Sequence, residues 1–111
     1  MWGWGGGPHN EGMRLRPELR EGLKRLMAEE LGPDCEVWLF GSRVDDAQRG
    51  GDIDLLVRSP VAVPQRWHRE SHLAVRALRL AEGRKVDLLL IDPLTELQPI
   101  HREALATGVP L

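Results

Sequence analysis

Apolar residues recur at intervals of three and four in three stretches of the chain, the spacing that places side chains along one side of a helix. The stretches cover residues 17–31, 64–81 and 99–106. In the first, the stripe consists of Leu19, Leu23, Leu26 and Met27. Pro17 suits the first position of a helix, and Gly32 supplies its end. The pattern predicts three amphipathic helices.

Three shorter apolar runs lie between these helices, at residues 35–40, 53–57 and 85–91. Each has the length and composition of a buried strand, and the last is the most apolar. The predicted order is helix, strand, strand, helix, strand, helix, with no internal repeat. This order indicates an α+β fold, an α/β layer in which helices cover one small sheet.

The predicted inner face of the second helix consists of Trp67, Leu73, Ala74, Ala77, Leu78 and Ala81. Four arginines follow the same helix: Arg66, Arg69, Arg76 and Arg79. A row of arginines is usually a solvated face, and the alternative is a surface for a partner. His68 and His72 are four residues apart, but zinc needs further ligands, so a solvated pair is favoured. His101 is expected at the surface, and Cys35 is expected to act as a small apolar residue.

The composition excludes several classes of protein. The 111 residues allow one domain, and 41% hydrophobic with 29% charged residues is typical of a globular chain. A net charge of −2 argues against direct binding of nucleic acid. No apolar run is long enough to span a membrane, and the amino terminus lacks the features of a signal peptide. The single cysteine favours a reducing compartment, so we expect a cytoplasmic protein.

The amino-terminal residues differ in composition from the rest of the chain. Residues 1–12 hold five of the twelve glycines and show no periodicity, so we expect a flexible lead-in. The expected domain covers residues 13–111, with Met13 an alternative start. A role for Trp2 and Trp4 in docking on a partner is a second interpretation of this segment.

Three polar features sit at the ends of the predicted strands. They are Gly41-Ser42-Arg43 after the first strand, Asp52 and Asp54 at the start of the second, and Asp87 inside the third. Because side chains alternate along a strand, Asp52 and Asp54 project to one side while Ile53 enters the core. Neighbouring carboxylates repel unless a cation lies between them, and oxygen ligands suit Mg²⁺ or Mn²⁺. If Asp87 lies beside them, the three acids form a two-metal site for phosphoryl or nucleotidyl transfer.

The Gly-Ser turn provides the matching anion site. Gly41 lets the backbone approach a phosphate closely, and Ser42 offers a hydroxyl beside its own N–H. Arg43 is placed to help hold a triphosphate. Each feature also has a simpler interpretation, because exposed acids are common at strand ends and Asp87 has Arg84 and Lys85 nearby as structural ion-pair partners. The combination in this order is more specific than any one of its parts.

Taken together, these residues resemble the signature of the DNA polymerase beta-like nucleotidyltransferase superfamily. Ser42 is followed by nine residues and then Asp52-x-Asp54, with Asp87 on a later strand. The spacer is one residue shorter than the commonest one in that family. The closest resemblance is to the minimal nucleotidyltransferases (MNT), and it covers residues 14–111, including the ending Gly108-Val109-Pro110-Leu111.

The resemblance implies a mixed sheet flanked by helices and a Mg²⁺-dependent enzyme that uses ATP. Gly41 and Ser42 would hold the β- and γ-phosphates, and Asp52 and Asp54 would bind the metals. Asp87 would bind the second metal and orient the acceptor hydroxyl. MNT proteins commonly pair with HEPN-domain toxins, whose tyrosine they adenylylate as antitoxins. A hetero-oligomer with such a partner is therefore expected.

The identity of the acceptor is open at this stage. The chain contains no tyrosine, so a tyrosine acceptor would belong to another molecule. One alternative is a non-catalytic antitoxin that neutralises a HEPN partner by occlusion. Another is transfer to a small molecule such as an aminoglycoside, which is less favoured because the short chain has no second domain to form that pocket.

Overall fold

The computed structural model describes residues 15–40 and 53–111. The elements in this part of the chain are α2 (Pro17–Leu31), β1 (Glu36–Phe40), β2 (Ile53–Arg58), α3 (Arg66–Leu80), β3 (Val86–Ile91), α4 (Pro99–Thr107) and β4 (Val109–Pro110). The three predicted helices and three predicted strands are confirmed, with ends that differ by no more than two residues. The predicted lead-in, residues 1–12, lies outside the described residues.

The four strands form one mixed sheet in the order β3-β2-β1-β4. β1 is antiparallel to both β2 and β4, whereas β2 and β3 are parallel and are joined by α3. The fold is α+β, as the sequence predicts. β4 is not predicted, because two residues that include Pro110 carry no strand periodicity.

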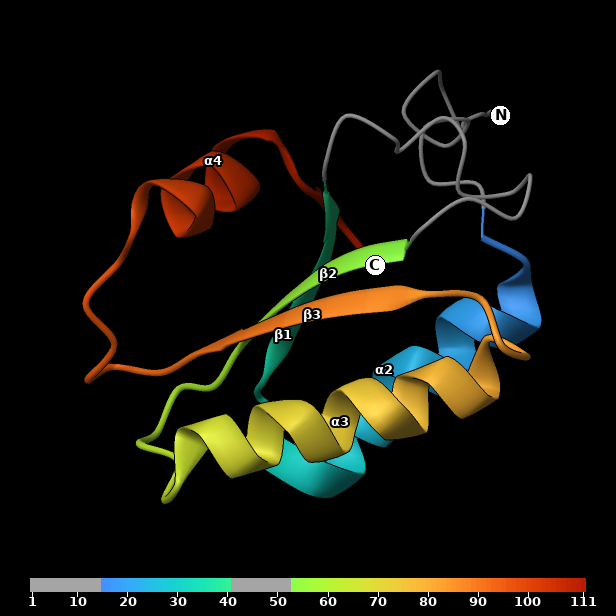
Figure 1. Cartoon of the computed structure of the whole chain (residues 1–111), viewed down its shortest axis with the longest axis horizontal. Coiled ribbons are helices and arrows are strands. Elements are labelled where there is room, and N and C mark those ends of the chain that lie inside the picture. Colours follow the sequence, from blue (N-terminus) through green and yellow to red (C-terminus); the bar gives the residue numbers. More distant parts are fainter. Residues whose placement is uncertain (1–14, 41–52) are drawn as a thin grey trace.

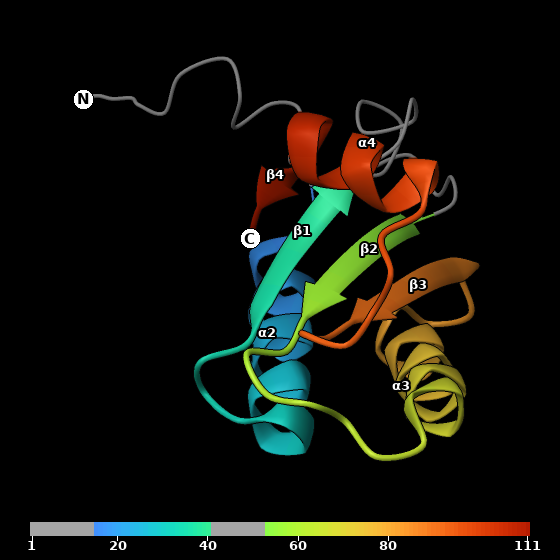
Figure 2. The same ribbon diagram turned by 90° about the vertical axis from the view of Figure 1, so that its left-hand side faces the viewer.

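The two faces of the sheet are covered differently. Figure 2 shows α2 and α3 side by side against one face, and α4 across the other. The α2–α3 side holds the larger core, to which β2 contributes Ile53, Leu55 and Val57, all fully buried. On the α4 side, Ala104 packs with Leu56, Phe40 and Ile91. Alternate residues of each strand therefore enter different cores, as the strand geometry requires.

Three side-chain positions differ from the predictions, and one of them is Leu78, which is 37% exposed although it is predicted on the inner face of the helix. Trp67 is 72% exposed instead of facing the core, because Leu73 and Ala77 turn a different side of α3 towards the sheet. His101 is buried instead of lying at the surface. It is the third residue of α4, and its Nδ1 accepts a hydrogen bond from the backbone N–H of Gln98 at 3.0 Å, which closes a capping box.

No helix in the described part of the chain is long and apolar enough to span a membrane.

Candidate active site

Two of the predicted site carboxylates, Asp54 and Asp87, are direct neighbours in the sheet. They are paired in the parallel register of β2 and β3, and each is the second residue of its strand. Both therefore lie at the same end of the sheet. Asp54 is half-buried and Asp87 is exposed. The structure thus brings together two residues that are more than thirty positions apart in the sequence.

The end of β1 lies beside the same pair. Phe40, the last residue of β1, is the antiparallel partner of Asp54. Gly41, Ser42 and Arg43 follow Phe40 directly in the chain, and Asp52 directly precedes β2. These four residues lie outside the described residues, so their predicted roles stay predictions. The strand ends from which they continue are nevertheless adjacent.

The alternation of side chains explains why acids are tolerated here. Asp54 and Leu56 are two residues apart and so point to the same face of the sheet, the face that α4 covers. Leu56 is fully buried in the α4 core, whereas Asp54, nearer the strand end, is only half-buried. Asp87 is exposed and therefore avoids the desolvation cost that its apolar neighbours would impose on a buried carboxylate.

The donor atoms at this position fit a divalent cation of the magnesium type. Adjacent strands lie about 4.8 Å apart, so two facing carboxylates repel each other and share a cation readily. Their oxygens are the ligands that Mg²⁺ and Mn²⁺ prefer. Within residues 15–40 and 53–111 no cluster of three or more potential metal ligands occurs. The third predicted ligand, Asp52, lies outside those ranges.

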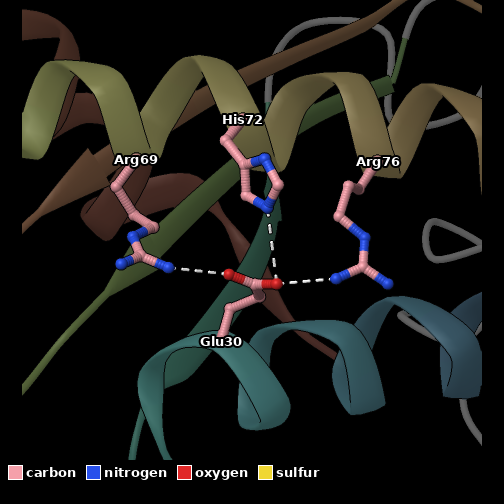
Figure 3. Close-up of polar contacts among 4 residues, drawn as sticks. All are labelled: Glu30, Arg69, His72 and Arg76. Carbon is pink, nitrogen blue, oxygen red and sulfur yellow. Dashed lines mark hydrogen bonds and ion pairs between the residues drawn. The ribbon is translucent and has the colours of Figure 1, made fainter.

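One of the two helix histidines, His72, belongs to a different feature, a cluster around Glu30 of α2. Arg69 Nη1 lies 2.8 Å from Glu30 Oε1, and Arg76 Nη1 lies 2.6 Å from Oε2. His72 Nε2 is 3.4 Å from the same Oε2. Figure 3 shows the three α3 side chains converging on this carboxylate from above. The cluster therefore ties α2 to α3, and we find no metal-binding arrangement around His68 and His72 among the described side chains.

The environment of Glu30 sets its charge. Burial alone would raise the pKa of Glu30, but hydrogen bonds from Arg69, Arg76 and His72 outweigh it and lower the pKa below its ordinary value of 4.5. Sequence reasoning missed this residue. The signal that points to it is the run of basic side chains at 69, 72 and 76, which share one side of a helix and are suited to an acidic counterpart.

Two other features lie away from the carboxylate pair. Cys35 is half-buried, and burial raises the pKa of its thiol, which supports the interpretation as a small apolar residue. A hollow of about 480 Å³ lies between α2 and the β1–β4 edge, with Trp38, Pro110 and Leu111 among its walls. It shares no residue with the strand ends at Asp54 and Asp87, so we do not assign it to the reaction.

Comparison with known proteins agrees with this geometry. A family model described as a nucleotidyltransferase domain matches residues 18–107. Comparison with curated protein sequences gives no significant match. Among solved structures, the chain resembles one in a crystal structure of a mutant toxin–antitoxin pair, MntA–HpeT, with a TM-score of 0.60 and 20% identity. The similarity covers 83% of this chain and 69% of that one, and it shows a shared fold.

Proposed function

The chain belongs to the nucleotidyltransferase domain family, and we propose that it transfers AMP from ATP to a hydroxyl of a partner protein as an antitoxin. The observation that carries the proposal is the pairing of Asp54 of β2 with Asp87 of β3, beside the strand end from which Gly41 and Ser42 continue. A pair of carboxylates that can hold divalent metal ions is an arrangement suited to metal-dependent nucleotidyl transfer. The family membership supports the reaction type, and the acceptor and nucleotide belong to the proposal.

Each residue of the proposed site has a distinct task. Asp52, Asp54 and Asp87 would hold two Mg²⁺ ions, which supply charge neutralisation at the triphosphate when bound. The backbone at Gly41 and the hydroxyl of Ser42 would hold the β- and γ-phosphates, with Arg43 beside them. The exposed position of Asp87 leaves it accessible to an incoming hydroxyl, which it would orient and help to deprotonate.

The proposed reaction replaces a phosphoanhydride linkage of ATP by a phosphoester linkage to the acceptor. The acceptor oxygen forms a bond to the α-phosphorus, the bond from that phosphorus to the β-bridging oxygen breaks, and pyrophosphate leaves. The hydroxyl proton passes through the Asp87 carboxylate to solvent. No oxidant or reductant is needed.

A protein acceptor is favoured over a group on the chain itself. The chain contains no tyrosine, so a tyrosine acceptor must be supplied by another molecule. The structural neighbour comes from a toxin–antitoxin pair, which supports a toxin as that molecule. Together with the MNT resemblance, this favours a tyrosine of a HEPN-domain toxin, a cytoplasmic location and a hetero-oligomer of the two proteins.

The experiment uses the protein encoded by the adjacent open reading frame as acceptor. It is incubated with the chain, Mg²⁺ and ATP labelled on either the α- or the γ-phosphate. We expect label from α-labelled ATP to enter the acceptor, and none from γ-labelled ATP. Transfer of the γ-label would identify a kinase, and absence of both labels would contradict AMP transfer to this protein.

A second candidate is neutralisation by occlusion, without chemistry. The exposed apolar side chains of α3, described below, favour it because a binding surface is enough for this function. Co-expression of the toxin with the Asp54→Asn/Asp87→Asn variant separates the two. Loss of protection against toxicity supports the enzymatic antitoxin, and retained protection supports occlusion.

A further inference from the structure

The helix α3 lies at an outer corner of the molecule. Figure 2 shows α2 on one side of it and β3 above it, with no described element on its remaining side. The side chains on that remaining side follow helical spacing: Trp67, Ser71, Val75 and Leu78. We call these four residues the α3 flank. All are exposed, and the three apolar ones are 72%, 48% and 37% exposed in chain order.

Trp67, the largest residue of the flank, has the side chain of Arg66 against its ring. The guanidinium of Arg66 lies 5.4 Å from the centre of the Trp67 ring, within the range of a cation–π interaction. Arg66 Nη1 also donates to the carbonyl oxygen of Leu90 at 2.9 Å, and Glu70 Oε2 accepts from the Leu90 N–H at 2.8 Å. Trp67 is therefore an exposed aromatic ring beside a side chain fixed to the edge of β3.

The charge of α3 restricts the kind of partner. The helix carries four arginines and one glutamate, whereas the whole chain has a net charge of −2. Arg69 and Arg76 share one carboxylate, that of Glu30. Arg79 is exposed and lies beside the α3 flank, because it is four residues after Val75 on the same helix. Two copies of this helix would repel each other, so an acidic surface is the complementary one.

The direction of α3 connects the flank to the candidate active site. α3 begins after β2 and ends just before β3, so its last turn lies at the end of the sheet where Asp87 is found. Figure 1 shows α3 running alongside β3, with the connection between them at that end. A protein bound along the flank would therefore extend from Trp67 to the end of the sheet where β3 begins, and it would reach Asp87, on the α4 face, around the β3 edge.

We propose that the α3 flank is the docking surface for the protein acceptor, with Trp67 as its main anchor. The acceptor would present an apolar pocket for the ring, with carboxylates placed opposite Arg79. Tryptophan and arginine dominate the binding energy of many interfaces, which is consistent with this assignment. The proposal rests on the proposed function, because that function requires a protein to be brought to the site.

The test measures binding of the chain to the protein encoded by the adjacent open reading frame, by calorimetry without ATP. We expect Trp67→Ala to raise the Kd at least about tenfold, as for the central residue of an interface. The matched control is Leu94→Ala, because Leu94 is 80% exposed and lies outside the flank. We expect it to change the Kd less than about twofold. Thermal unfolding of each variant checks that the fold is retained.

A charge reversal tests the acidic character of the partner surface. We expect Arg79→Glu to raise the Kd, and to reduce the dependence of the Kd on salt, more than Arg102→Glu does. Arg102→Glu is the control because it makes an equal change of charge at an exposed position of α4. The proposal is overturned if wild type and Trp67→Ala have equal Kd values, or if the wild-type chain does not bind the protein at all. It is also overturned if Trp67 mediates self-association or RNA binding in place of protein binding.

Binding and catalysis are separated by measuring the Kd and the rate of AMP transfer side by side for wild type and Trp67→Ala. Trp67-dependent binding without any transfer of AMP would contradict the proposed function and leave the docking surface standing. AMP transfer that is equally efficient in wild type and Trp67→Ala would contradict the docking surface and leave the proposed function standing.

Discussion

Asp54 and Asp87 stand opposite each other in the parallel pairing of β2 and β3, although α3 separates them in the sequence. Their adjacency follows from the crossover that returns the chain to the same sheet beside β2. Two carboxylates on neighbouring strands repel unless they share a positive charge. The pairing places the two carboxylates side by side, as the proposed metal site requires.

The first prediction concerns the effect of Mg²⁺ on stability. A ligand that binds only the folded state raises stability by about 1.4 kcal/mol at a tenfold excess over its Kd. We expect Mg²⁺ to raise the melting temperature of wild type, and to have little effect on Asp54→Asn or Asp87→Asn. Asp34→Asn, an exposed acid before β1, is the control and is expected to respond like wild type. An equal response of all four proteins would argue against a metal at the pair.

The second prediction concerns the buried His101. Burial, with a smaller effect of the Arg66 charge, lowers the pKa of His101 below its ordinary value of 6.5. The unfolded chain therefore binds a proton first as the pH falls through 6.5, and the folded state loses stability until its own pKa is reached. Protonation of Nδ1 would also remove the bond from the Gln98 N–H.

The measurement for His101 is the free energy of unfolding in urea between about pH 7.5 and pH 5. We expect wild type to lose stability over this interval and His101→Gln to lose less, since glutamine keeps a capping group at this position. His68→Gln changes an exposed histidine of α3 and is expected to follow wild type. Parallel curves for all three proteins would contradict the assignment.

The third prediction concerns Glu30 and its three partners. Glu30→Gln removes the charge to which Arg69 and Arg76 are bound, and both arginines are more than 40% exposed. We expect a loss of about 1 kcal/mol in the free energy of unfolding at neutral pH. Glu29→Gln, at the exposed neighbouring position, is the control and is expected to change little.

The same cluster has a defined pH dependence. The folded-state pKa of Glu30 is lowered, so its contribution is complete above the ordinary value of 4.5 and is lost as the pH falls through the folded pKa. The difference in unfolding free energy between wild type and Glu30→Gln should therefore shrink below pH 4.5. A difference that stayed constant down to the acid transition would show that the charge is not responsible.

The fourth prediction compares two glycines. A Cβ at Gly108 would clash with the carbonyl oxygen of Ala104 and lie 3.1 Å from the Cβ of Trp38. We expect Gly108→Ala to cost about 1–3 kcal/mol, because the turn from α4 into β4 cannot expand freely. At Gly22, inside α2, the nearest atom would be Leu80 Cδ1 at 3.7 Å. Gly22→Ala should instead stabilise the chain by up to about 1 kcal/mol, as chemical denaturation would show.

Most of the fold could be predicted from the sequence, because its helices and strands have clear periodicity and end at glycine or proline. β4 could not, since two residues carry no periodicity and their pairing with β1 is a contact between segments far apart in the sequence. Periodicity also fails to fix which flank of a helix is covered, so Trp67 was assigned to the core and is exposed. His101 was assigned to the surface because its capping partner, Gln98, becomes relevant only once the start of α4 is known.

The candidate site was predictable in its residue types but not in its arrangement. The sequence presents Asp54 and Asp87 on separate strands, and only the strand order makes them neighbours. The predictions for Gly41, Ser42, Arg43 and Asp52 concern residues outside the described part of the chain and stay predictions. Their test is functional.

The measurement that tests the central claim most directly is the rate of Mg²⁺-dependent AMP transfer in a double-mutant cycle of Asp54→Asn and Asp87→Asn. If the pair acts as one unit, each single variant should lower kcat/KM at least about a hundredfold, and the double variant should lose little more. Asp34→Asn serves as the control and should retain the wild-type rate. Wild-type rates in both single variants, or transfer that does not require Mg²⁺, would contradict the assignment of this carboxylate pair as the catalytic centre.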